Sequence, residues 1–219
     1  MHALGRRSGP LEALRTDLGE AVVPWVVDVD DGPALRAAFA ALPGVDVLVL
    51  NAGLCATAAL GAPESVAVWQ AVLRTNLDGV FHGLEAALPH LLRGGRVVAV
   101  ASGLGKLGRA GYGAYCAAKH GVLGLVRAAA LEWAPRGITV NAVCPGWVDT
   151  PMARGDLARA AEQAHRPVAM LRAEAEAGIP LGRFVTAEEV ADLIGFLASP
   201  AAAMITGEAY NLSGGAFTS

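Results

Sequence analysis

Short apolar runs alternate with longer helical segments along nearly the whole chain. Three of these runs are rich in β-branched residues and are followed by small or polar residues: VDVLVL (Val45–Leu50), RVVAVAS (96–102) and GITVNAV (137–143). Runs this short are typical of strands that are buried on both faces of a parallel sheet. A regular alternation of strand and helix places helices on both faces of such a sheet. The sequence therefore predicts an α/β protein with a doubly wound parallel sheet.

The remaining expected elements complete this alternation. We expect further strands at 1–4, 21–29 and 208–212. We expect helices at 10–18, 32–42, 65–92, 113–134, 156–177 and 187–197, with Pro89 breaking the third near its end. A chain of 219 residues is long enough for one sizeable core. We therefore expect a single domain.

Charge and composition argue against several classes of function. The net charge of −3 offers no basic surface for nucleic acid. The hydrophobic fraction is 54%, yet no run reaches the roughly 20 apolar residues of a membrane helix. The opening MHALGRRSGP lacks the apolar core of a signal peptide. The three cysteines and five histidines lack metal-ligand spacing, so we expect a cytoplasmic protein with reduced thiols and no metal site.

One stretch, SGLGKLGRAGYGAYCAAK (102–119), carries residues suited to proton transfer. Ser102 follows an apolar run, and Tyr115-x-x-x-Lys119 lies in a helical pattern. On a helix, Tyr115 and Lys119 are neighbours on one face, and a cation beside a phenol favours the phenolate. The trio suits proton transfer to or from a carbonyl or alcohol oxygen. The same Tyr/Lys spacing also occurs by chance on many helices, so the rest of the chain has to decide.

Three expected strands end in small or polar residues at the same edge of the sheet. These ends are Asn51-Ala52-Gly53, Ser102-Gly103 and Pro145-Gly146. The carboxyl ends of parallel strands lie together, and open α/β sheets bind their ligands there. Each glycine alone is ordinary turn chemistry. Together the three ends predict one crevice, lined in part by Tyr115 and Lys119.

These motifs, with TNLDG around Asn76 and PGWVDT at 145–150, resemble the short-chain dehydrogenases/reductases. The resemblance covers nearly the whole chain, and the joint order and spacing of its motifs are highly specific. It implies a Rossmann-like fold over 1–219 and an NAD(P)-dependent enzyme that interconverts a carbonyl and a secondary alcohol.

The resemblance also implies a role for each matched residue. Tyr115 would be the general acid/base, and Lys119 would lower its pKa while binding the nicotinamide ribose. Ser102 would polarise the substrate carbonyl, and Asn76 would hold a water in a proton relay behind Lys119. Val148 and Thr150 would contact the nicotinamide carboxamide. The full implied cofactor-binding set is Arg6, Asp28, Val29, Asn51, Ala52, Gly53, Tyr115, Lys119, Pro145, Gly146, Val148 and Thr150.

The segment Gly5-Arg6-Arg7 bears on the choice of cofactor. An acidic residue after the second strand of such a fold binds a ribose 2′-hydroxyl, whereas an arginine accommodates a 2′-phosphate. Gly5 resembles the family's acidic position and Arg6 the basic position after it. NADP(H) is therefore favoured over NAD(H). The alternative is that Arg6 and Arg7 are solvated loop charges.

One departure from the family pattern concerns the first strand, its T-G-x-x-x-G-x-G turn and the first helix. The turn and the helix N-terminus hold the pyrophosphate, but the present chain starts inside what resembles the second strand. The absent strand would lie next to the strand ending at Asn51. Either the sequence is a truncated or wrongly started version of a complete enzyme, which we favour, or it is a short form. A short form would be a non-catalytic or vestigial binding protein.

The motifs say less about the substrate. KHGVLG, GITVNAVCPGWVDTPMA and IPLGRFVTAEEVA look most like ketoreductases of the 3-oxoacyl and aromatic polyketide kind. By resemblance, 151–182 would be a substrate lid. Its arginines could meet an acyl-carrier phosphate or form a solvated face. The long helices expected at 65–92 and 113–134 would build a homotetramer.

Overall fold

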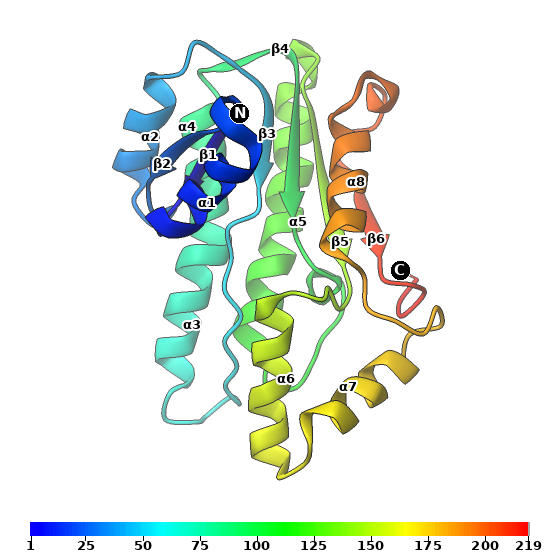
Figure 1. Cartoon of the computed structure of the whole chain (residues 1–219). Helices are drawn as coiled ribbons and strands as arrows, with labels where there is room; N and C mark the ends of the chain where they lie inside the picture. Colours follow the sequence, from blue (N-terminus) through cyan, green and yellow to red (C-terminus); the bar gives the residue numbers. More distant parts are fainter. Residues whose placement is uncertain (219) are drawn as a thin grey trace.

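The computed structural model describes residues 1–218, and strands and helices alternate along them (Figure 1). The strands are β1 (His2–Gly5), β2 (Val23–Val26), β3 (Val45–Leu50), β4 (Leu91–Val100), β5 (Thr139–Pro145) and β6 (Ala209–Leu212). The α-helices are α1 (Ser8–Leu18), α2 (Gly32–Ala40), α3 (Ser65–Leu73), α4 (Gly79–Ala87), α5 (Gly113–Trp133), α6 (Pro151–Ala164), α7 (Val168–Ala177) and α8 (Ala187–Ala198). The short helical turns are η1 (Gly19–Ala21), η2 (Arg74–Asp78), η3 (Gly103–Gly105), η4 (Ala134–Arg136) and η5 (Pro200–Ala202). This order confirms the expected α/β, Rossmann-like fold.

The strands form two parallel sheets. β1 pairs with β2, and the other four strands pair in the order β3-β4-β5-β6. Every one of these pairings is parallel. Among residues 1–218, β4 is the only strand partner of β3, which is the strand that ends next to Asn51. The sheet is therefore interrupted beside β3, where the sequence analysis placed the absent strand.

Helices cover both faces of the four-stranded sheet. Val97, Ala99, Val140 and Ala142 belong to a large core that also contains residues of α2, α4 and α5. Val98 and Val143 point to the other face, where they pack with Leu197 of α8. Alternate residues of a strand face opposite sides, so the uniformly apolar runs of β4 and β5 fit a sheet that is buried on both sides.

The face of β3 that carries Val47 and Val49 is more open. These two side chains are 43% and 42% exposed, whereas Leu48, on the opposite face of the strand, is 8% exposed. In a sheet covered on both faces such valines are buried. The exposure of Val47 and Val49 thus lies at the interruption of the sheet.

The expected helix over 65–92 is wrong in its extent. The structure divides it into α3, the π-helical turn η2 and α4, and α4 ends at Ala87. β4 then begins at Leu91, ahead of the expected start at 96. Pro89 lies between the two elements and cannot continue a helix hydrogen-bond ladder. The apolar residues after it pair with the beginning of β3, at Val45 and Leu91.

The expected single helix over 156–177 is also wrong. Two helices occur, because His165 has a positive φ of 50° and Pro167 precedes the second helix. The first of them, α6, starts earlier than expected, at Pro151, with the Thr150 hydroxyl accepting from the Ala153 amide. Threonine before a proline is a strong helix start. Figure 1 shows α6 and α7 beyond the carboxyl ends of the strands.

Candidate active site

Ser102 and Tyr115 meet at the carboxyl end of β4. Ser102 precedes the turn η3, and its hydroxyl oxygen accepts from the Leu104 amide at 3.1 Å. Tyr115 is in the first turn of α5, and its hydroxyl is hydrogen-bonded to the Ser102 side chain. A serine and a phenol that share a hydrogen bond at a strand end can both bond to one substrate oxygen. The structure thus brings together the two residues that the sequence placed there.

Lys119 lies one helical turn after Tyr115 and is buried. Its ammonium nitrogen donates to the Val100 carbonyl oxygen at 2.8 Å and lies 5.7 Å from the centroid of the Tyr115 ring. The residue is 4% exposed. Burial lowers the pKa of Lys119 to about 8. A group with such a pKa can gain or lose a proton near neutral pH.

The pKa of Tyr115 differs from the expectation. Burial, followed by the charges that Cys55 and Asp156 can carry, raises the pKa of Tyr115 to about 12, while the hydrogen bond with Ser102 lowers it. The resemblance to the family implied that Lys119 would lower this pKa. In the structure, burial disfavours the charged form of both groups, so the phenol is neutral at pH 7. A neutral phenol is the form that donates a proton to a carbonyl oxygen.

Asn76 holds the turn after β3. Its side chain is fully buried in the π-helical turn η2. The side-chain oxygen accepts from the Leu54 amide, and the side-chain nitrogen donates to the Leu54 carbonyl, both at 2.8 Å. A Cβ atom on Gly53 would lie 3.4 Å from the Asn76 oxygen and 3.9 Å from the Lys119 nitrogen. Asn51-Ala52-Gly53, Asn76 and Lys119 are therefore brought together as expected.

The structure also joins two residues of the implied cofactor-binding set, Arg6 and Asp28. The Arg6 guanidinium nitrogen lies 3.8 Å from an Asp28 carboxylate oxygen. Gly5 pairs with Val26, so Arg6 and the Asp28-Val29 segment follow neighbouring strand ends. Both charged side chains are exposed enough to meet a ligand, at 57% and 37%.

The segment Pro145 to Thr150 connects β5 to α6. Val148 forms a parallel bridge with Val185, and the Thr150 hydroxyl donates to the Val148 carbonyl oxygen at 3.3 Å. A Cβ atom on Gly146 would lie 3.2 Å from the Ser213 side chain, so a larger residue is crowded there. The segment is thus packed against Val185 and Ser213 at the third of the three strand ends.

Comparison with known proteins decides the family. A family model described as enoyl-(acyl carrier protein) reductase matches residues 3–216. The chain is 42% identical over 213 residues to the monensin polyketide synthase putative ketoacyl reductase of Streptomyces virginiae, covering 94% of this chain and 81% of that protein. The chain belongs to the short-chain dehydrogenase/reductase family. It is an NAD(P)-dependent oxidoreductase of the carbonyl/alcohol type.

Other short-chain dehydrogenases/reductases agree in sequence and in fold. The D-beta-hydroxybutyrate dehydrogenase of Cupriavidus necator is 39% identical over 209 residues, which cover 93% of this chain and 79% of that protein. The crystal structure of a Phe-to-Trp variant of actinorhodin polyketide ketoreductase with NADPH has a TM-score of 0.90 and 38% identity. The superposition covers 98% of the present chain and 86% of the ketoreductase chain.

The residues of this short-chain dehydrogenase/reductase suit the two nucleosides of a dinucleotide better than the pyrophosphate that joins them. Lys119 supplies a donor beside Tyr115, and the Thr150 hydroxyl lies in the segment that follows β5. Asp30, after Asp28 and Val29, has a buried carboxylate oxygen with no partner among the described residues. These groups fit a nicotinamide ribose and an adenosine, respectively. Residues 1–218 contain no T-G-x-x-x-G-x-G turn for the pyrophosphate.

Sequence reasoning missed a cluster beside Tyr115. Tyr112, Asp156 and Arg159 are hydrogen-bonded in a row, and Cys55 lies within hydrogen-bonding reach of Arg159. Burial raises the pKa of Cys55 to about 11, so its thiol stays protonated at neutral pH. Tyr112 is close to Tyr115 in sequence, which is a weak signal, but only the fold shows that Asp156 reaches it.

No group of three His, Cys, Asp or Glu side chains in residues 1–218 could hold a metal ion. Within the same residues, no helix has the length and apolar character needed to cross a membrane.

Proposed function

We propose that this chain reduces the ketone of a 3-oxoacyl or polyketide-type substrate to a secondary alcohol, with NADPH as the preferred reductant. The hydrogen-bonded pair of Ser102 and Tyr115, with Lys119 buried behind it, is the observation that carries the proposal. The ketoacyl reductase and polyketide ketoreductase names of the relatives support the substrate class. The short-chain dehydrogenase/reductase motifs alone favour no particular ketone.

The proton chemistry follows from the neutral state of Tyr115. The bound reduced nicotinamide supplies a hydride to the carbonyl carbon. As negative charge develops on the carbonyl oxygen, the Ser102 hydroxyl donates a hydrogen bond and Tyr115 transfers its proton to that oxygen. Preorganised donors at such an oxygen contribute about 3–4 kcal/mol each. Once the alcohol has formed, Tyr115 remains as a phenolate.

Lys119 and Asn76 would restore the proton on Tyr115. A phenolate beside the ammonium of Lys119 is stabilised by the nearby cation. The pKa of about 8 lets Lys119 give up its proton and recover it from solvent. Asn76 holds Leu54 through two hydrogen bonds and lies next to Lys119. We place the relay water of the family between this asparagine and the lysine.

The preference for NADPH rests on Arg6. Its guanidinium is 57% exposed and lies 3.8 Å from Asp28. An exposed ion pair of this length contributes little to folding, so the arginine is available for a 2′-phosphate. Arginine recognises phosphate with charge-assisted and often bidentate hydrogen bonds.

We propose residues 151–182 as the substrate lid. The helices α6 and α7 lie beyond the carboxyl ends of the strands, where Ser102 and Tyr115 meet (Figure 1). Arg172 of α7 contacts Asp149 at 2.9 Å and stacks on Phe184 at 4.8 Å. Arg172 is thus occupied by protein partners, which favours a structural role for it over binding of an acyl-carrier phosphate.

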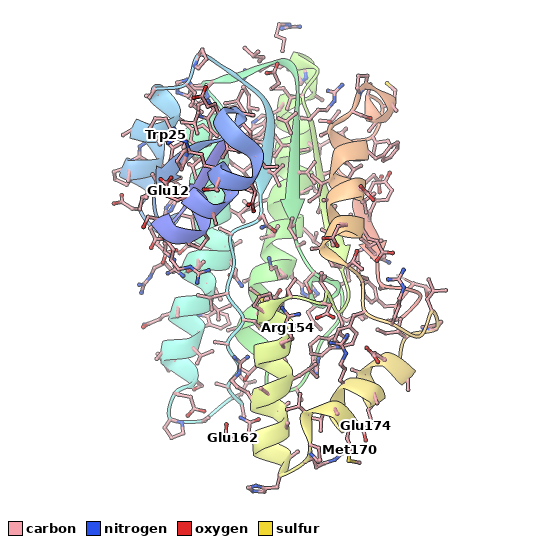
Figure 2. The ribbon with its side chains drawn as sticks, in the orientation of Figure 1. Glu12, Trp25, Arg154, Glu162, Met170 and Glu174 are labelled. Atoms are coloured by element: carbon pink, nitrogen blue, oxygen red, sulfur yellow. The ribbon has the colours of Figure 1, made fainter. Side chains whose placement is uncertain are left out.

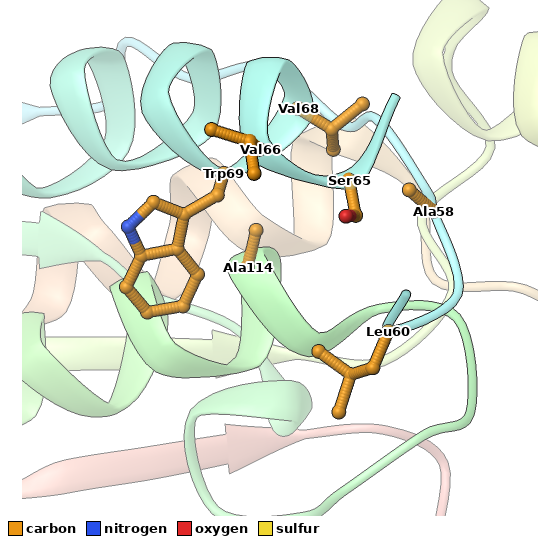
Figure 3. A pocket seen from close by; sticks show the side chains of 7 residues that line it. All are labelled: Ala58, Leu60, Ser65, Val66, Val68, Trp69 and Ala114. Atoms are coloured by element: carbon orange, nitrogen blue, oxygen red, sulfur yellow. The ribbon is translucent and has the colours of Figure 1, made fainter. Parts of the chain in front are cut away.

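We propose a homotetramer in which α3, α4 and α5 pack against other copies. Large apolar side chains on these helices are exposed, namely Val66, Trp69, Phe81 and Leu131. Val66 and Trp69 also line an apolar pocket of about 210 Å³ between α3 and the start of α5 (Figure 3). Exposed apolar patches of this kind mark interaction sites. Light scattering of the purified protein measures the mass; a monomer would refute this part of the proposal.

We also propose a cytoplasmic location. The three cysteines, Cys55, Cys116 and Cys144, are free thiols in the structure. Free thiols are typical of a reducing compartment.

The substrate class is tested by initial rates of NADPH oxidation with three probes. Acetoacetyl-coenzyme A represents the 3-oxoacyl thioesters, a bicyclic ketone represents the polyketides, and free acetoacetate represents the 3-oxo acids. We expect kcat/KM to be highest for one of the first two probes. A preference for free acetoacetate would instead assign the enzyme to small 3-oxo acids, which it would reduce to 3-hydroxy acids. No reduction of any ketone at millimolar NADPH would favour the non-catalytic binding protein.

A further inference from the structure

One buried hydrogen bond attaches the lid to the start of α5, the helix that carries Tyr115. The hydroxyl of Tyr112 donates to a carboxylate oxygen of Asp156 at 2.5 Å. Tyr112 is the residue before the first turn of α5, which carries Tyr115, and Asp156 is in α6. Both residues are buried, at 9% and 6% exposure. The contact therefore links the helix that carries the acid/base to the first helix of the lid.

Both carboxylate oxygens of Asp156 accept a hydrogen bond. Its second oxygen accepts from the Arg159 guanidinium at 2.6 Å. A buried carboxylate costs several kcal/mol unless it is paired and hydrogen-bonded. Burial and the hydrogen bond to Asp156 hold the pKa of Tyr112 well above its usual range, so the phenol is a donor throughout the physiological pH range. The bond is of the charge-assisted kind, which is about twice as strong as a neutral one.

A second contact supports the same attachment. The Arg109 guanidinium lies 4.6 Å from the centroid of the Tyr112 ring and 5.2 Å from that of Trp147. Trp147 stacks on Phe184 at 5.4 Å with 9° between the rings. Arg109 thus packs on the face of the Tyr112 ring, while Asp156 accepts the hydrogen bond from its hydroxyl. The ring of Tyr112 is fixed at both its face and its oxygen.

We propose that Tyr112 and Asp156 are a positioning pair that holds α6 closed over the Ser102 and Tyr115 site. This inference rests on the proposed function in one respect, since it takes α6 to cover the substrate. Closing such a site excludes water and completes its geometry. Neither residue touches the reacting atoms in the scheme above. Their hydrogen bond raises the fraction of molecules in which the lid is closed.

The proposal predicts a particular kinetic pattern. If the lid closes less often, substrate binds less tightly, but the chemistry of the closed complex is unchanged. Losing a hydrogen bond to a charged group corresponds to about a 10- to 100-fold change in an equilibrium. Tyr112→Phe removes only the hydroxyl. We expect the KM for the ketone to rise at least tenfold, while kcat and the NADPH dissociation constant change less than twofold.

A matched control removes another lid contact. Arg166 and Glu174 form an exposed ion pair that joins the end of α6 to α7, and Glu174 is labelled on α7 in Figure 2. This ion pair shares no residue with the contacts that join Tyr112 and Asp156. We expect Glu174→Gln to leave KM and kcat within twofold of the parent. A second test variant, Asp156→Asn, keeps an oxygen that can accept from Tyr112, so its KM should rise less than that of Tyr112→Phe.

Amide hydrogen exchange tests the attachment without any activity. In Tyr112→Phe we expect the amides of α6 to exchange about tenfold faster or more, with those of β4 and β5 unchanged. Equal exchange of α6 in parent and variant would overturn the proposal, whether or not a ketone is reduced. A fall of kcat at unchanged KM would also overturn it, because Tyr112 would then act in the chemical step. If no ketone is reduced even by the parent, the proposed function fails and the exchange result alone decides the positioning pair.

Discussion

The ammonium of Lys119 lies 5.7 Å from the ring centroid of Tyr115 and donates a 2.8 Å hydrogen bond to the Val100 carbonyl. The lysine is thus held at the end of β4 while it remains beside the phenol. Burial raises the pKa of Tyr115 to about 12 and lowers that of Lys119 to about 8, so at pH 7 the phenol is neutral and the lysine is still mostly protonated. A proton that leaves Tyr115 therefore creates a charge that the adjacent lysine stabilises.

Lys119 should make the stability of the fold depend on pH. Its pKa is about 8 in the folded chain against an ordinary value of 10.5. Between these values the unfolded chain holds more protons, so the free energy of unfolding rises with pH. We expect the parent to gain stability relative to Lys119→Met between pH 8 and 9.5. Melting curves of both proteins at three pH values measure the difference; a constant difference would contradict the buried, proton-losing lysine.

Asn76 should contribute to both stability and turnover. Asn76→Ala leaves the amide and carbonyl of Leu54 without partners, which costs about 1–3 kcal/mol each. Asn141 offers a matched control, because it is equally buried and also makes two backbone hydrogen bonds, to Ile205 and Glu208. We expect similar losses of stability in both alanine variants, but a loss of kcat beyond tenfold only for Asn76→Ala. Equal kcat in the two folded variants would remove Asn76 from the relay.

Arg6 should decide between the two dinucleotides. A charge-assisted contact to a 2′-phosphate contributes about 1.5–3 kcal/mol, or roughly a 10- to 100-fold effect on affinity. We expect kcat/KM to favour NADPH over NADH in the parent and the preference to disappear in Arg6→Ala. Arg7→Ala is the control, since it removes the neighbouring positive charge. Equal kcat/KM values for both cofactors, unchanged by Arg6→Ala, would refute this role.

The interrupted sheet predicts weak cofactor binding by the polypeptide of residues 1–219. β3 lacks a second strand partner in the described residues, and the T-G-x-x-x-G-x-G turn is absent from them. Two or three missing charge-assisted bonds weaken binding by several powers of ten. We expect a dissociation constant for NADPH well above the micromolar range. Micromolar binding in a titration calorimeter, with the protein folded, would show that another segment holds the pyrophosphate.

Much of the fold followed from local sequence patterns. The strand Val45–Leu50 was predicted with the observed bounds, because an apolar run between turn residues leaves little choice. The helix from Gly113 was predicted with its start, and its period correctly placed Tyr115 beside Lys119. The position of the interruption followed from the missing motif, because β3 has a single strand partner in the described residues.

The remaining features depend on contacts that are distant in sequence. Tyr112 and Asp156 meet only because α6 folds back onto the start of α5. The start of β4 at Leu91 depends on its pairing with Val45, and apolar residues there fit a helix as well. The predicted direction of the Tyr115 pKa shift was wrong. Burial raises this pKa more than a nearby cation lowers it, and the spacing of residues does not reveal burial.

The most direct test of the central claim is the rate of ketone reduction by Tyr115→Phe, with kcat obtained for variant and parent alike by raising NADPH into the millimolar range. Phenylalanine keeps the ring and loses the proton, so the acid/base step alone is removed. General acid/base catalysis contributes about 10²- to 10⁴-fold, and we predict a fall of that size in kcat with an unchanged melting temperature. A rate within tenfold of the parent, at the same melting temperature, would contradict the assignment of Tyr115 as the acid/base.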